Sequence, residues 1–144
     1  MKRMINMKRF FTTILCIFLV FSMIGTSTAF AAIESNAYIS SFSGAVSVAN
    51  DGTVTVNFGT IGTSYMDKVG ASAISVYENG SWVATYYYSN PKYTATMMGT
   101  NVHYFYGYVT YSGTKGNTYQ AHITHYAEKN GGNGTEDLWT AYAT

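Results

Sequence analysis

From residue 38 onward, apolar and polar residues alternate in short runs, and turns rich in glycine and asparagine separate these runs. Residues 53–58 show the pattern most clearly, with Val54, Val56 and Phe58 on one side. Successive side chains of a strand point to opposite faces, so alternation with a period of two is typical of a half-buried β-strand. No run shows the 3.6-residue spacing of an amphipathic helix. The pattern therefore predicts an all-β domain.

Turn signals divide this part of the chain into about seven antiparallel strands. Asp51-Gly52 and Asn79-Gly80 are two-residue sequences that favour tight hairpins, because Asp, Asn and Gly all tolerate a positive φ. Glycines at 59, 62 and 70 bracket an expected loop between strands at 53–58 and 73–78, and residues 130–134 form another expected loop. This spacing of turns is typical of a β-sandwich.

The first 31 residues have a different character. Positive charges at Lys2, Arg3, Lys8 and Arg9 precede an apolar run over residues 14–24, and Ala29-Phe30-Ala31 follows as a cleavage pattern. This order is typical of a secretory signal peptide, and the apolar run is shorter than the roughly 20 residues of a spanning helix. We expect a signal peptide at 1–31, cleaved after Ala31, and one secreted domain at 32–144 with no stable membrane anchor.

Cleavage would change the charge and the chemistry of the chain. Eight basic residues less those four leave four, against seven acidic ones, so the formal charge of residues 32–144 is −3. Cleavage would also remove Cys16, the single cysteine. These counts argue against a disulfide scaffold, a thiolate metal site, a cysteine nucleophile and an electrostatically driven nucleic-acid binder.

One segment resembles a known kind of β-sandwich. Residues 113–123, Gly-Thr-Lys-Gly-Asn-Thr-Tyr-Gln-Ala-His-Ile, are similar to the approach to the sixth strand of immunoglobulin-like and fibronectin-type-III-like domains. The resemblance implies that Tyr119 is a tyrosine corner, whose hydroxyl bonds back to the upstream backbone. It also implies a tryptophan in the core, for which Trp82 is the candidate, and a single immunoglobulin-like antiparallel sandwich.

More narrowly, residues 37–144 resemble a group of small secreted proteins of Gram-positive bacteria. The matching motifs are Tyr-Ile-Ser-Ser-Phe-Ser at 38–43, Met-Asp-Lys-Val-Gly-Ala-Ser at 66–72, Tyr-Glu-Asn-Gly-Ser-Trp at 77–82 and Ser-Gly-Thr-Lys-Gly at 112–116. These motifs concern turns and core. The resemblance therefore implies a fold and an extracellular address, and no activity.

Metal and catalytic sites are weakly supported by spacing. His122 and His125 are three residues apart on an expected strand, so they point to opposite faces and cannot share an ion. Residues 131–136 match one copy of a calcium-binding glycine repeat that normally works in stacked copies, so an ion held by Glu136 and Asp137 stays open. We predict no catalytic, cofactor-binding or metal-binding residues and expect no enzyme.

Tyrosines supply the one positive indication of function. Tyr104, Tyr106 and Tyr108 share a parity on one expected strand, opposite to the apolar positions of that strand, and polar residues at 53, 55 and 57 are candidates for the same outer face. A second candidate patch joins Tyr77, His122 and Tyr126, with Thr124 between the last two. Tyrosine with Ser, Thr and Asn is the mixture that antibody paratopes use for contact, although β-propensity alone also favours tyrosine in strands.

The sequence thus predicts a secreted, non-catalytic binding module for a glycan, a cell-wall component or another protein. Two other classes stay open at this point: a self-associating surface or matrix protein, and a small secreted antagonist of neighbouring cells. Low charge and aromatic strands favour edge pairing in the first of these. The oligomeric state is not indicated by the sequence.

Overall fold

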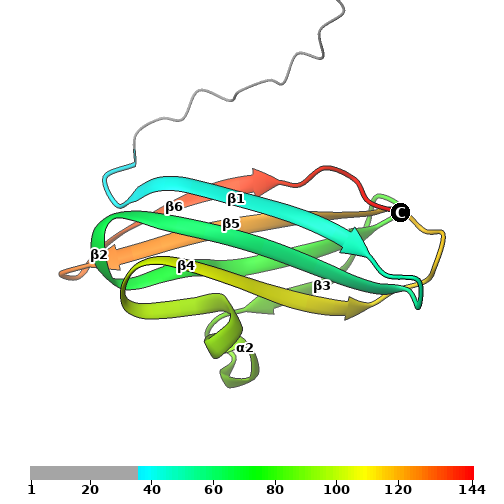
Figure 1. The fold of residues 1–144 in the computed structure, drawn as a ribbon, viewed down its shortest axis with the longest axis horizontal. Helices are drawn as coiled ribbons and strands as arrows, with labels where there is room; N and C mark the ends of the chain where they lie inside the picture. The colour runs from blue at the N-terminus through cyan, green and yellow to red at the C-terminus, as the bar shows by residue number, and fades with distance from the viewer. Residues whose placement is uncertain (1–35) are drawn as a thin grey trace, which may run out of the picture. The chain divides into compact units, whose positions relative to one another are not determined.

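The computed structural model describes residues 36–144, which form one antiparallel six-stranded sheet and a single short helix (Figure 1). In chain order the elements are β1 (Ile39–Val48), β2 (Thr53–Glu78), β3 (Ser81–Tyr87), α2 (Pro91–Met97), β4 (Met98–Ser112), β5 (Tyr119–Lys129) and β6 (Gly132–Trp139). The prediction of an all-β antiparallel domain is confirmed. The expected signal peptide lies outside the described residues. Between residues 36 and 144 no helix has the length and apolar character needed to cross a membrane.

β2 organises the sheet, because it hydrogen-bonds to four other strands. Residues 53–61 of β2 lie between β1 and β4, residues 73–78 lie between β3 and β5, and β6 pairs with β5. Between Ile61 and Met66 the register shifts and the strand turns back on itself. The Thr60 hydroxyl, on one side of this bend, donates to the Gly70 carbonyl on the other side at 2.8 Å. The sheet is therefore a curled half-barrel (Figure 1).

This topology corrects the predicted strand count and the predicted loop at 59–70. The structure has six strands in one sheet, where the sequence predicts about seven in two sheets. The β2–β4 ladder continues on both sides of the bend, from Ile61 opposite Tyr104 to Met66 opposite Val102, so β2 is continuous. The glycines in this stretch accommodate a tight bend and close packing inside one strand, which local sequence does not distinguish from a loop.

The core fills the inside of the curl. Val54 and Val56 from the first half of β2 belong to the same buried cluster as Ile74 and Val76 from its second half and Ile123 from β5. The alternation at 53–58 is therefore confirmed as a strand with one buried face. Met97 at the end of α2 and Met98 at the start of β4 also belong to the interior and are 0% and 6% exposed.

The two-residue turn predicted at Asn79-Gly80 is confirmed, whereas β1 and β2 are joined by residues 49–52, of which only Gly52 has a positive φ. Asn79-Gly80 joins β2 to β3 and Asn130-Gly131 joins β5 to β6, all four residues having a positive φ. Such turns match the right-handed twist of paired strands. The loop expected at 130–134 is shorter than predicted, because β6 begins at Gly132.

The helix α2 is not predicted by the sequence. Its N-cap is Asn90, whose side chain accepts a hydrogen bond from the Lys92 backbone at 3.1 Å, and Pro91 occupies the first turn. A proline fits there because the backbone N–H groups of the first turn have no acceptor within the helix, so the N–H that proline lacks costs no hydrogen bond. Asn90 and Pro91, which end the strand pairing, therefore also start a helix. The buried residue of this helix is Met97.

Two residues implied by the immunoglobulin-like resemblance have different environments. Tyr119 is fully buried, and its hydroxyl accepts a hydrogen bond from the Thr114 backbone at 2.6 Å, five residues upstream. Trp82 is 61% exposed, so its expected place in the core is wrong. It lies opposite Tyr77 in the β2–β3 ladder, beside a register shift, on the outer face of the sheet.

Candidate functional site

The predicted tyrosine row lies on the outer face of β4. Tyr104, Tyr106 and Tyr108 are 59%, 65% and 51% exposed, whereas Val109, the next residue along the strand, is buried in the core. Their spacing along the strand is set by its rise, so the row extends over about 14 Å. The rings of Tyr104 and Tyr106 lie 5.7 Å apart, centroid to centroid. The structure thus confirms the outward direction of these three side chains.

Small uncharged residues accompany the tyrosines across the sheet. Asn57 of β2 lies between Ala45 of β1 and Tyr108, and Gly59 lies between Ser43 and Tyr106. Directly paired residues of an antiparallel ladder share one face. The outer positions of β1, of the first half of β2 and of β4 are all uncharged: Ser41, Ser43, Ala45, Ser47, Thr53, Thr55, Asn57, Gly59, Ile61, Tyr104, Tyr106, Tyr108, Thr110 and Ser112.

Gly59 determines how Tyr106 lies. A β-carbon at position 59 would overlap the Tyr106 ring, so the ring covers the glycine and reaches across the strand. The Ser43 hydroxyl lies 3.0 Å from the same point, on the far side of the glycine. The absence of a side chain at Gly59 therefore lets an exposed ring lie down on the sheet.

These features enclose an open hollow of about 440 Å³, which we call the tyrosine trough. One side carries Tyr106 and Tyr108, and the other carries Ser43 and Ala45, with Asn57 between them. The remaining lining residues are inward-facing ones whose backbones form the floor: Gly44, Phe58 and Gly107. The trough offers aromatic rings, hydroxyl groups and an amide, and its lining residues carry no formal charge.

The second predicted patch is divided by the structure. Tyr77 and His122 come together, since the ring of Trp139 lies 5.1 Å from Tyr77 and 4.7 Å from His122. Tyr126 is four residues further along β5 and packs on Tyr88, with ring centroids 6.0 Å apart. Parity correctly placed Tyr126 on the face of His122, but the distance along the strand separates the two.

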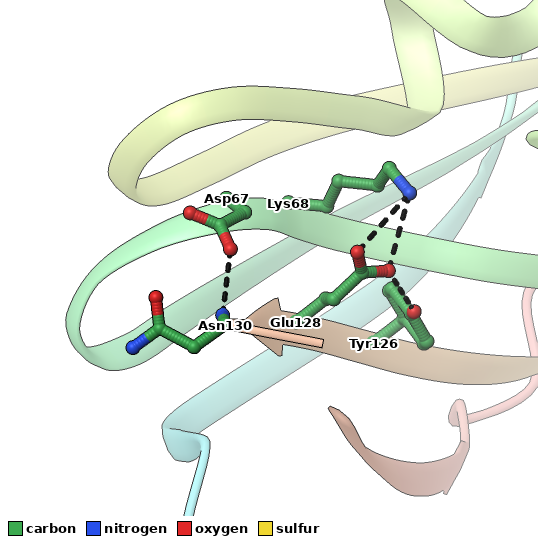
Figure 2. Close-up of polar contacts among 5 residues, drawn as sticks. All are labelled: Asp67, Lys68, Tyr126, Glu128 and Asn130. Atoms are coloured by element: carbon green, nitrogen blue, oxygen red, sulfur yellow. Dashed lines mark hydrogen bonds and ion pairs between the residues drawn. The ribbon is translucent and has the colours of Figure 1, made fainter. Parts of the chain in front are cut away.

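Tyr126 belongs instead to a polar cluster near the β5–β6 turn (Figure 2). Its hydroxyl donates to Glu128, whose carboxylate also contacts Lys68 at 3.1 Å. Beside this pair, the Asn130 backbone donates to Asp67 at 2.7 Å, which attaches the turn to β2. The hydrogen bonds from Tyr126 and then Lys68 lower the pKa of Glu128, and burial together with the Glu128 contact raises the pKa of Tyr126.

The two histidines of β5 point to opposite faces, as predicted. His122 lies outside, with Nε2 3.3 Å from the Asp137 carboxylate. His125 is fully buried, with Nδ1 2.8 Å from the Thr60 hydroxyl, and its Nε2 has no hydrogen-bond partner within residues 36–144. Burial lowers the pKa of His125 to about 4, against a weak opposing effect of Asp137. His125 is therefore neutral in the folded protein near pH 7.

The acidic residues near the last turn, Glu136 and Asp137, lie on β6 and face β5. Asp137 accepts a hydrogen bond from the Thr124 hydroxyl at 2.7 Å, and Glu136 lies opposite His125 in the β5–β6 ladder. In the part of the chain that the structure describes, no three His, Cys, Asp or Glu side chains converge as metal ligands. The absence of metal-binding residues stays a prediction, and an ion held by Glu136 and Asp137 stays the open alternative to it.

Trp139 and Trp82 are two exposed aromatic residues that sequence reasoning missed. Trp139 shares its parity with Asp137, which identifies it as outward-facing once β6 is known to be a strand. Its position beside Tyr77 depends on the pairing of three strands far apart in the sequence, which no local pattern shows. No protein-family model, curated protein or solved structure matches the chain.

Proposed function

We propose that the protein is an extracellular, non-catalytic binding module whose ligand is a neutral glycan chain lying in the tyrosine trough. The observation that carries this proposal is the combination of three exposed tyrosines with a hollow face that is uncharged throughout. Secretion and cleavage of residues 1–31 are part of the proposal and rest on the charge and apolar pattern of that segment.

The chemistry of the trough suits a saccharide. A pyranose ring has flat faces of C–H groups, which stack on aromatic rings, and a rim of hydroxyl groups, which hydrogen-bond to serine, asparagine and tyrosine. Tyr106 and Tyr108 supply the rings, and Ser43 and Asn57 supply the polar groups across the hollow. Few polar groups with an aromatic lining are typical of sites that orient a small ligand. A neutral ligand matches the uncharged lining.

The immunoglobulin-like relationship is retained as part of the proposal. Its support is the order of strands around the bend of β2, with β1 and β4 flanking the first half and β3, β5 and β6 arranged around the second. The bond from the Thr114 backbone to the Tyr119 hydroxyl adds to this support. Many cell-surface binding domains are immunoglobulin-like sandwiches. The proposed ligand nevertheless rests on the trough and not on the fold.

The direct test is sedimentation of the purified protein with insoluble polysaccharides, cellulose and chitin among them, beside isolated Gram-positive cell walls. The test variant is Tyr104→Ala/Tyr106→Ala/Tyr108→Ala, and the matched control is Tyr142→Ala, which removes a tyrosine that is 66% exposed outside the trough. We expect the triple variant to bind at least roughly tenfold more weakly, since stacking contacts contribute about 1 kcal/mol each.

Three outcomes decide the proposal. Binding by the wild type and the control, with weakened binding by the folded triple variant, supports it. No binding to any polysaccharide or wall fraction removes it. If the wild type instead grows in size with concentration and the triple variant does not, the tyrosine face is a self-association surface.

A further inference from the structure

An aromatic strip crosses the outer face of the second half of the sheet. It consists of Trp82 on β3, Tyr77 on β2, His122 on β5 and Trp139 on β6. Trp82 lies directly opposite Tyr77 in the ladder, and Trp139 contacts both Tyr77 and His122. Four neighbouring strands thus contribute one ring each, and Trp82 and Trp139 are 61% and 51% exposed.

Contacts within the protein hold the rings of this aromatic strip in place. The indole Nε1 of Trp82 donates to the Thr85 hydroxyl at 2.9 Å, and Thr85 is hydrogen-bonded to Ser75 at 2.8 Å. Trp139 packs between two other rings, with interplanar angles of 50° to Tyr77 and 33° to His122. Side chains ordered before binding lose less conformational entropy when a ligand arrives, so the strip is prepared for stacking.

Polar groups accompany the rings. Asp137 lies two residues before Trp139 on the same face of β6, and its side chain is 60% exposed although it already accepts the Thr124 hydroxyl. A carboxylate has more acceptor sites than these contacts occupy. It can therefore accept hydrogen bonds from the hydroxyl rim of a sugar that is stacked on Trp139.

We infer that the aromatic strip is a second saccharide site, which takes a β-linked pyranose chain with equatorial substituents. Equatorial substituents leave both faces of the sugar ring free to lie flat on an aromatic side chain. Val56 and Val76, on the inner faces of the two halves of β2, share one core, so the strip and the tyrosine trough face away from each other. One molecule then holds two glycan chains and bridges them. The bridging rests on the proposed function, whereas the site itself rests on the contacts of the strip.

Tryptophan fluorescence measures sugar binding at the aromatic strip separately from binding in the trough. The chain has two tryptophans, and both belong to the strip. Cellohexaose and N-acetylchitohexaose are titrated into the purified protein and into the trough variant Tyr104→Ala/Tyr106→Ala/Tyr108→Ala. We expect a saturable change in tryptophan emission with at least one of the two sugars in both proteins.

Substitution within the strip tests the residues. Tyr77→Ala keeps both fluorescent reporters, and we expect it to weaken the emission titration roughly tenfold, the loss of about one stacking contact. Tyr65→Ala is the matched control, because Tyr65 is 72% exposed at the bend of β2 and packs on His103. The second site is overturned if Tyr77→Ala titrates like the wild type, or if neither sugar changes the tryptophan emission. Binding in the trough is tested separately, by the sedimentation experiment.

Bridging is measured by mixing the protein with polysaccharide-coated beads and recording whether the beads clump. The wild type is expected to clump them, and variants of either face are expected to bind them but to clump them less, because one of the two sites is weakened. Equal clumping by the Tyr77→Ala variant and the wild type overturns the inference. A concentration-dependent change in tryptophan emission without sugar also overturns it, since that result assigns the strip to contact between copies of the chain.

Discussion

The ring of Tyr106 lies over Gly59, directly across the β2–β4 ladder. A methyl group at position 59 would occupy the space of that ring, and Tyr106 is exposed enough to swing away without disturbing the core. We therefore predict that Gly59→Ala leaves the protein folded but weakens glycan sedimentation several-fold. Ser47→Ala, on the same face but outside the lining of the trough, leaves the ring in place and serves as the control. Unchanged binding by Gly59→Ala would show that the position of Tyr106 does not matter.

His125 makes the stability of the fold depend on pH. Its pKa is about 4 in the folded protein and 6.5 in the unfolded chain, so the unfolded chain binds the proton first as the pH falls. The associated stability is complete above pH 6.5 and is lost progressively toward pH 4, by about 3 kcal/mol. Denaturant unfolding of the wild type and of His125→Gln, measured from about pH 7 to pH 4, checks this. Parallel pH dependence in the two proteins would contradict it.

The Tyr119 hydroxyl joins the β4–β5 turn to β2. It accepts the Thr114 N–H and donates to Glu78, and the residue is fully buried. Tyr119→Phe leaves that N–H without its partner, so we predict a loss of about 1–3 kcal/mol in the free energy of unfolding. Tyr142→Phe, at an exposed position, is the control and should unfold like the wild type. Denaturant midpoints at constant m-value report the difference.

Met97 attaches the short helix α2 to the core. Its side chain is fully buried in the cluster that contains Val109 and Tyr86. Met97→Ala is predicted to cost about 2–5 kcal/mol through lost burial and the cavity left behind. Lys92→Ala is the control, because Lys92 is an exposed residue of the same helix, and it should change stability by no more than about 0.5 kcal/mol. Thermal unfolding measures both, and equal losses in the two variants would show that Met97 does not anchor the helix.

The strands, the inward faces and the tight turns follow from local sequence. A period of two separates Val54 and Val56 from their polar neighbours, and Asn79-Gly80 needs only its own φ angles to form a hairpin. These features depend on residues within a few positions of one another. For the same reason the outward direction of Tyr104, Tyr106 and Tyr108 was predictable.

The missed features depend on distant partners or on ambiguous local signals. Asn90-Pro91 is a sequence that can end a strand or begin a helix, so it does not distinguish the two. The helix α2 has seven residues, which are too few for a helical period to be recognised. Trp139 meets Tyr77 only because β5 lies between their strands. Residues 59–70 likewise form a bend and not a loop because a distant segment, β4, pairs with β2 on both sides of the bend.

The continuity of β2 has a mechanical consequence. A strand that pairs with β1, β3, β4 and β5 ties both outer faces to one backbone, so neither face can rotate against the other without breaking ladder hydrogen bonds. Two-domain proteins hold their surfaces through a hinge or a linker, which gives a range of angles. Here the angle between the faces is set by the bend of a single strand, which pairs with β4 on both sides of that bend.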